Sequence, residues 1–174
     1  AMYRERYDGL KNSVESGGGK VTLLKRASNI QNELIDELRQ ISANRGIKLE
    51  EQSIGFFAYH DTMAAEMISL CLRHKLRIPE NIAILGVDND DLINGGLSVE
   101  LSSVDSDQEG LGTDAARLLS ALLDNTKKSP KNKIYRHSPK GVVARRSTDC
   151  YAVHNPLVAN ALHWIHKNFY NGIQ

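Results

Sequence analysis

The sequence predicts an α/β fold in which a parallel sheet is flanked by helices. Short apolar runs of strand length alternate with longer segments whose apolar residues recur at helical spacing. Several of these runs are apolar throughout, which is typical of strands that are buried on both faces of a parallel sheet. The segments between them are long enough to form the helical crossovers that parallel strands require.

The first part of the chain predicts two helices with a short strand between them. A helix is expected over residues 3–16, where apolar side chains recur at helical spacing before a run of glycines. The residues VTLL at 21–24 have the apolar character of a short buried strand. The second helix is expected to begin at a capping box of Ser28 and Gln31 and to end at Gly46.

The central part of the chain predicts two strands of the sheet and the helix that joins them. SIGFFAYH at 53–60 and IAILGV at 82–87 are the strand candidates, and a helix is expected over 62–75. The apolar residues of this helix are expected to point inward: Met63, Met67, Ile68, Cys71 and Leu72.

The segment LSSVDS at 101–106 precedes a strongly periodic helix at 107–124. A capping box of Ser106 and Glu109 is expected to begin this helix. Its apolar residues predict one inward face: Leu111, Ala115, Leu118, Leu119 and Leu122.

The last part of the chain predicts short extended pieces and a terminal helix. The extended pieces are expected at 134–137 and 141–147, and the arginines of the second piece are expected to face solvent. Pro156 is suited to the first position of the terminal helix. The apolar residues that follow recur at helical spacing: Val158, Leu162, Ile165 and Phe169.

The composition is that of an ordinary globular protein, with 41% hydrophobic and 25% charged residues. The net charge of +1 argues neither for nor against a polyanionic partner. No apolar run approaches the roughly 18 residues of a membrane span, so no membrane partner is expected. Cys71 and Cys150 are the only cysteines, and their positions favour a reduced cytoplasmic setting over a disulfide framework.

Polar side chains follow two of the predicted strands at the point where each strand ends. His60 and Asp61 follow the first strand, and Asp88 and Asn89 follow the second. Open parallel sheets bind ligands at this edge, and carboxylates with amides suit the hydroxyls of a sugar. Asp88 adjoins its strand and is the best ligand candidate, whereas Asp61 is equally well placed to cap the next helix. The following acids, Asp90 and Asp91, are expected to be solvated.

Acid–base catalysis by His60 and Asp61 is the alternative that this cluster raises. The sequence has no nucleophile elbow of the form GxSxG and no histidine pair at metal-ligand spacing. We therefore expect a protein that is not an enzyme, with no catalytic residues, no metal site and no cofactor. A small hydrolase or isomerase and a stand-alone sugar-binding module stay open as alternatives.

Five motifs resemble, in order and spacing, the sugar-sensing domains of lactose/galactose-type repressors, which are similar to periplasmic sugar-binding proteins. The motifs are RYDGL (6–10), HDTMA (60–64), LRIPENIAILGVDND (76–90), LSSVDSDQEGLGTDAARLL (101–119) and GVVARRSTD (141–149). The resemblance implies the carboxyl-terminal lobe of a periplasmic-binding-protein-like type I fold.

The stretch NPLVANALHWIHKNFYNGI at 155–173 looks like the first helix of an AraC-type helix-turn-helix module. A sensor followed by such a module resembles the xylose operon regulators. This resemblance implies a partial sensor at 2–149 and a linker with a truncated module at 150–174. It also implies xylose or a related monosaccharide as effector and operator DNA as partner. The recognition helix would lie beyond Gln174, so this chain alone is expected not to bind specific DNA.

Carried over residue by residue, the sugar-binding residues of the family are Arg6, His60, Asp61, Asp88 and Asn89. His60 departs from the pattern, because an imidazole replaces an amide and changes the donors offered to the sugar. The helix at 107–124 belongs, in the family, to a second lobe whose sheet is absent from this sequence. Its leucine face therefore either meets a second copy of the chain or stays exposed, which favours a homodimer.

Overall fold

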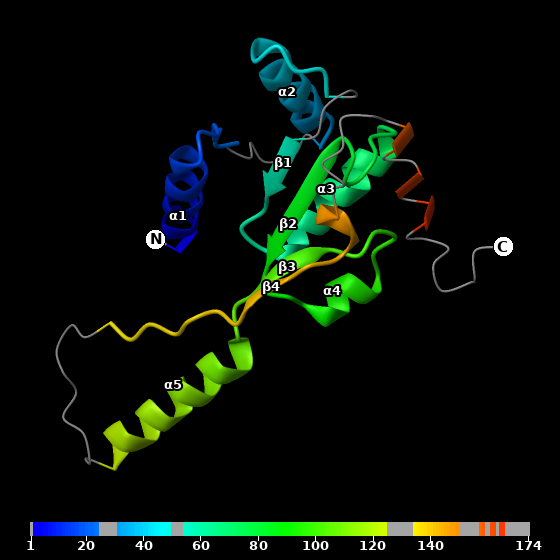
Figure 1. Cartoon of the computed structure of the whole chain (residues 1–174). Helices are drawn as coiled ribbons and strands as arrows, with labels where there is room; N and C mark the ends of the chain where they lie inside the picture. The colour runs from blue at the N-terminus through cyan, green and yellow to red at the C-terminus, as the bar shows by residue number, and fades with distance from the viewer. Residues whose placement is uncertain are drawn as a thin grey trace.

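The computed structural model describes residues 2–24, 31–49, 54–124 and 134–149, together with 157–158, 161–162 and 164–165. Within these residues the fold is α/β, as the sequence predicts, with one sheet flanked by helices (Figure 1). None of the described helices is both long and apolar enough to cross a membrane.

The sheet has four strands in the order β1-β2-β3-β4 across the described part of the chain. The strands β1 (Ile54–Phe57), β2 (Ile82–Val87) and β3 (Ser102–Asp105) are parallel, whereas β4 (Gly141–Val143) is antiparallel to β3. The chain leaves the carboxyl edge of the sheet after β3 and returns to the same edge, so β4 must run in the opposite direction. The prediction of a parallel sheet flanked by helices is therefore confirmed, and β4 joins this sheet as an antiparallel strand.

The core lies between the sheet and helix α3 (Asp61–Arg73), which packs against β2. Ile82 and Ile84 of β2 are fully buried, as are Met67, Ile68 and Cys71 of α3. The predicted inward face of α3 is wrong at Leu72, which is 44% exposed, whereas Leu70 is buried. The buried face turns toward Leu70 because α3 also contacts helix α2 (Gln31–Asn44).

Helix α2 ends as the sequence predicts. Gly46 adopts a φ of +70°, a left-handed conformation that glycine tolerates without a steric penalty. The amides of Gly46 and Ile47 donate to the carbonyls of Ala43 and Ser42, which closes the carboxyl end of the helix. The expected capping box at the other end involves Ser28, which lies outside the described residues.

Helix α1 (Met2–Ser16) is confirmed, but the strand expected at 21–24 is wrong. This segment has no regular secondary structure and joins no described strand. Arg45, just after α2, instead donates to the hydroxyl of Thr22 and to the carbonyl of Lys20. The segment is thus held by the end of α2 and does not extend the sheet.

Helix α5 (Gln108–Leu123) projects away from the sheet (Figure 1). None of its residues is buried, and Leu111 and Leu119 are at least half exposed. The predicted inward leucine face is therefore wrong, because the sheet does not extend beneath this helix. The predicted capping box is also wrong: Asp107, at φ +50°, caps the helix by accepting from the amide of Gly110.

The remaining elements are short. Asp90 caps helix α4 (Asp91–Gly95) by accepting from the amides of Leu92 and Ile93, so it is not the free solvated acid that the sequence predicts. A 3-10 turn, η1 (Arg146–Thr148), interrupts the extended piece expected at 141–147. The described residues of the terminal helix, between 157 and 165, are helical, whereas Phe169 lies outside the described residues.

Candidate functional site

The predicted site residues meet at the carboxyl edge of the sheet, around the loop that follows β2. Asp88 and Asn89 adopt φ angles of +110° and +53°, which L-residues rarely occupy. The Asp88 amide donates to the Val104 carbonyl, and the Asn89 amide donates to the Ser103 hydroxyl at 3.0 Å. Two hydrogen bonds to β3 therefore hold the loop in this unusual conformation, which is a common property of ligand sites.

Arg6 reaches this loop from α1. Its Nη2 lies 3.5 Å from Oδ1 of Asp88, and both side chains are about one-quarter exposed, at 24% and 26%. Its Nη1 donates to the carbonyl of Tyr59, directly after β1. The hydroxyl of Ser106 also donates to Oδ1 of Asp88, at 3.2 Å. The guanidinium thus joins α1 to the ends of two neighbouring strands.

His60 caps helix α3. The sequence instead predicts either this capping role or a ligand role for Asp61. Its Nδ1 accepts from the amide of Met63 at 3.1 Å. The imidazole is half-buried and meets the ring of Tyr59 edge to face, with centroids 4.0 Å apart. The cap therefore fixes the ring at the edge of the site.

Asp61 lies beneath the site and is only 1% exposed. Its Oδ1 accepts from the hydroxyl of Ser103 at 2.6 Å, and its Oδ2 accepts from the amide of Asp90 at 2.9 Å. Because both oxygens already accept hydrogen bonds from the protein, Asp61 supports the loop at 88–90 from below. Gly86 leaves the space for this carboxylate, since a Cβ at Gly86 would lie 2.1 Å from Oδ1.

Arg145 is part of the site, although the sequence pattern predicts that it faces solvent. Its Nη2 donates to Oδ1 of Asn89 and its Nη1 to the carbonyl of Leu101, both at 2.8 Å. Nearby, the buried hydroxyl of Ser147 donates to the carbonyl of Ile84 at 2.6 Å and accepts from the amide of Ser102. The only sequence signal for these contacts is the position of both residues in the motif GVVARRSTD.

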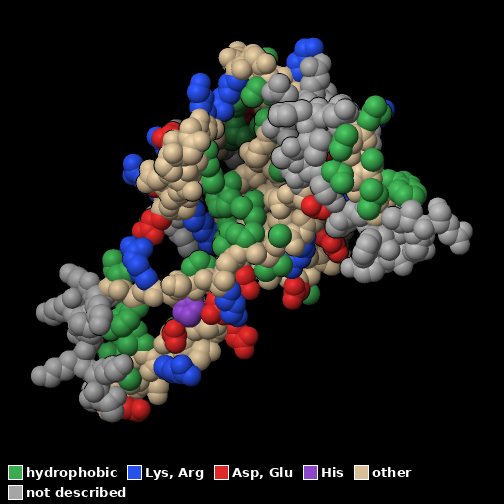
Figure 2. Space-filling view, in the orientation of Figure 1, with side chains coloured by type: hydrophobic (Ala, Val, Ile, Leu, Met, Phe, Trp, Pro, Cys, Tyr) green, Lys and Arg blue, Asp and Glu red, His purple; other side chains and the backbone are tan. Residues whose placement is uncertain are grey.

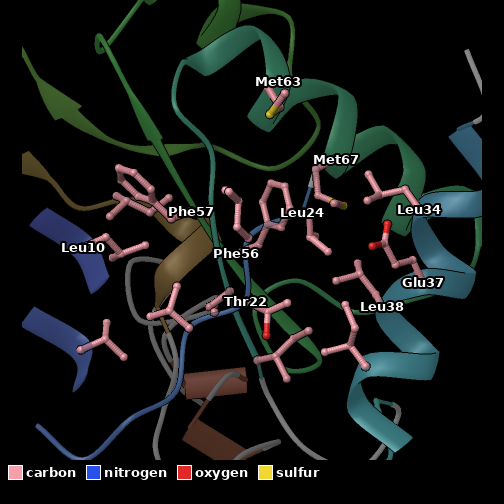
Figure 3. A pocket seen from close by; sticks show the side chains of 18 of the residues that line it. Leu10, Thr22, Leu24, Leu34, Glu37, Leu38, Phe56, Phe57, Met63 and Met67 are labelled. Atoms are coloured by element: carbon pink, nitrogen blue, oxygen red, sulfur yellow. The ribbon is translucent and has the colours of Figure 1, made fainter. Parts of the chain in front are cut away.

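A separate cavity of about 1110 Å³ lies between α1, α2 and β1. Figure 3 shows Leu10, Leu34, Leu38, Phe56 and Met67 around it, and Figure 2 shows hydrophobic side chains in the same hollow. The cavity adjoins the carboxyl edge of the sheet, because Arg6 and Tyr59, which bond to each other there, also line the cavity. A mainly apolar lining does not match the hydroxyls of a sugar, so the polar edge is the better candidate site.

A second polar cluster joins the start of α5 to the segment at 134–140. His137 lies 2.8 Å from Asp107 and 2.9 Å from Asp114, and Nζ of Lys140 lies 2.7 Å from Asp107. Hydrogen bonds from Lys140 and His137 lower the pKa of Asp107 to about 2. Hydrogen bonds to Asp107 and then to Asp114 raise the pKa of His137. The cluster thus holds the two chain segments together through charge.

The described residues contain no group of three His, Cys, Asp or Glu side chains that could hold a metal ion. Cys71 is a free thiol, and burial raises its pKa to about 12. It therefore stays protonated at neutral pH, as a packed core residue does.

Comparisons with known proteins agree with this architecture. The family model described as "Periplasmic binding protein-like domain" matches residues 3–148. The chain is 31% identical over 156 residues to the xylose operon regulatory protein of Escherichia coli (strain K12), a match that covers 90% of this chain and 37% of that protein. It is 34% identical over 111 residues to the protein of the same name from Haemophilus influenzae, a match that covers 64% of this chain and 28% of that protein.

Among solved structures, a xylose-binding transcription activator superposes with a TM-score of 0.62 at 31% identity. The superposition covers 83% of this chain and 35% of that structure. The matches thus span between 28% and 37% of the length of these relatives. Because the family model matches most of its residues, the chain belongs to the periplasmic binding protein-like domain family.

Proposed function

We propose that this chain is the sensor part of a sugar-responsive DNA-binding transcription regulator, with xylose or a related monosaccharide as its effector. The observation that carries the proposal is the pair of Arg6 and Asp88 at the carboxyl edge of the sheet, with His60 and Asn89 beside it. This edge is where open α/β sheets bind ligands, and its side chains combine donors with acceptors as sugar hydroxyls require. The names of the relatives favour xylose.

In this proposal Asp88 accepts hydrogen bonds from sugar hydroxyls, and Arg6, His60 and Asn89 donate to them. Asp61 acts indirectly, because its oxygens already accept from Ser103 and Asp90. The same geometry argues against catalysis by His60 and Asp61. His60 uses Nδ1 to cap α3, and Asp61 accepts from partners other than the imidazole.

The proposed partner of the whole protein is operator DNA, bound through an AraC-type module that begins near Asn155. Residues 2–149 would form part of the sensor, and residues 150–174 the linker and the first helix of that module. Residues 145–148 fasten the end of the sensor to the candidate site and the sheet, because Arg145 contacts Asn89 while Ser147 and Thr148 bond to the sheet. The exposed leucine face of α5 supports a homodimer, and the proposed setting is the cytoplasm.

Isothermal titration calorimetry with a panel of pentoses and hexoses tests the sensor proposal. Asp88→Ala removes a charged acceptor, and we expect it to weaken binding of the preferred sugar by at least about tenfold. Asp91→Ala is the matched control, because Asp91 is exposed at the start of α4, next to the loop, and its loss should leave affinity unchanged. Equal affinities of the wild type and Asp88→Ala, or no binding of any sugar by the wild type, would contradict the proposal.

A further inference from the structure

We infer that Asn89 and His60 present N–H donors to the ligand, because a donor of the protein holds the acceptor atom of each side chain. Arg145 is the positioning residue that imposes this polarity on Asn89. The inference rests on the proposed function and adds to it the kind of ligand atom that each position selects.

The orientation of the Asn89 amide follows from the chemistry of Arg145. A guanidinium has only donors, so the amide atom 2.8 Å from its Nη2 must be the oxygen, Oδ1. A flipped amide would place the Asn89 NH₂ group against the guanidinium, with a donor facing a donor. Arg145 cannot easily retreat, because its Nη1 donates to the Leu101 carbonyl and its backbone amide donates to the Ser102 hydroxyl.

The fixed oxygen leaves Nδ2 of Asn89 directed away from Arg145. The side chain is half-buried, and its one side-chain hydrogen bond within the described part of the chain is the bond through Oδ1. An amide normally both donates and accepts, so a free asparagine could bind either kind of ligand atom. Here Oδ1 is held against Arg145, whereas Nδ2 has no partner among the described residues, so the donor half is the half that this inference assigns to the ligand.

The tautomer of His60 follows in the same way. The Met63 group that bonds to Nδ1 is a backbone amide, which can only donate. Nδ1 is therefore unprotonated, and the neutral ring carries its proton on Nε2. His60 thus also offers a donor at the edge of the site.

Asp88 has the opposite polarity. Its Oδ1 faces Arg6 and accepts from the Ser106 hydroxyl, while its carboxylate can accept but not donate. In this inference a bound sugar donates from the hydroxyl that faces Asp88 and accepts at each hydroxyl that faces Asn89 or His60. The site distinguishes two hydroxyls that would otherwise be chemically equivalent.

Deoxy and deoxyfluoro derivatives of xylose test this polarity in the chain together with any flanking segments that its reading frame encodes. A C–F group accepts hydrogen bonds weakly and donates none, whereas a C–H group does neither. At a hydroxyl that faces Asn89 or His60, we expect the fluoro sugar to bind about threefold or more tighter than the deoxy sugar. At the hydroxyl that faces Asp88, fluorine should give no advantage, since a carboxylate repels it.

Variants of Asn89 and Arg145 separate positioning from stability. Asn89→Asp keeps the pair with Arg145 but replaces the donor by an oxygen, so the preference for fluorine should vanish or invert. Arg145→Gln can offer either a donor or an acceptor to Asn89 and should weaken the preference, whereas Arg145→Lys has donors only and should retain it. His60→Asn should also retain it, because asparagine can cap α3 and still donate.

Three results would overturn the inference. The first is unmodified xylose binding without a preference for fluorine over hydrogen at any position, which would refute the polarity alone. The second is an absence of binding by every unmodified monosaccharide, which would refute the proposed function and the inference together. A preference that survives unchanged in Asn89→Asp would likewise show that Asn89 is not the donor.

Discussion

Replacing Gly86 with alanine tests how tightly the candidate site is packed from below. The new Cβ would lie 2.1 Å from Oδ1 of Asp61, 3.2 Å from its Cγ and 3.1 Å from a methyl group of Leu101. An ordinary contact needs more than 3 Å, so the carboxylate must move by about 1 Å. Asp61 is 1% exposed and bonded to Ser103 and Asp90, so this movement breaks at least one of those bonds.

The expected cost combines two effects. Overpacking of a buried site costs about 1–3 kcal/mol, and a lost hydrogen bond to a charged group costs about 1.5–3 kcal/mol. Gly86→Ala should therefore reduce the free energy of unfolding by about 2.5–6 kcal/mol, a large part of the stability of a typical domain. Urea denaturation followed by circular dichroism measures this difference.

Gly55→Ala is the matched control, because Gly55 lies on the neighbouring strand and no atom lies within 4 Å of the position that a new Cβ would occupy. It should change the free energy of unfolding by less than about 1 kcal/mol. The double variant Asp61→Ala with Gly86→Ala should lose little more stability than Asp61→Ala alone. A Gly86→Ala variant within about 1 kcal/mol of the wild type would refute the argument.

Two further predictions concern the titratable groups. The lowered pKa of Asp107 gives stability that is present above its ordinary value of 3.8 and is lost as the pH falls toward about 2. The raised pKa of His137 gives stability that is complete below its ordinary value of 6.5 and is lost as the pH rises through the raised pKa. The melting temperature of the wild type should therefore exceed that of His137→Gln most in mildly acidic solution, and a difference independent of pH would contradict this. For Cys71, burial and a pKa of about 12 predict no reaction with Ellman's reagent at pH 8 until urea unfolds the chain, measured in a Cys150→Ser background. Rapid reaction of the folded protein would show that the thiol is accessible.

Several elements of the fold follow from local sequence alone. The strand at 82–87 is predicted with its observed bounds, because a short apolar run between turn residues has few other stable conformations. The end of α2 is equally predictable, since Gly46 can adopt the positive φ that closes a helix.

Other elements depend on partners that a local pattern does not specify. VTLL at 21–24 has strand composition, but Arg45 holds it away from the sheet. The leucines of α5 have the spacing of a buried face, yet a face becomes buried only where another layer covers it. Asp107 caps α5, for which the sequence predicts Ser106. His60 caps α3, for which the sequence offers Asp61 as the cap. The differences arise because capping depends on backbone angles near each terminus.

The candidate site divides in the same way. The strand pattern is enough to predict that Asp88 and Asn89 follow one buried strand and that His60 and Asp61 follow its neighbour. It does not predict that Asp61 lies beneath the site or that Arg145 orients Asn89, and both became evident from the folded chain. These contacts join segments far apart in the sequence, and their energy depends on distances and burial that exist only after the sheet has formed.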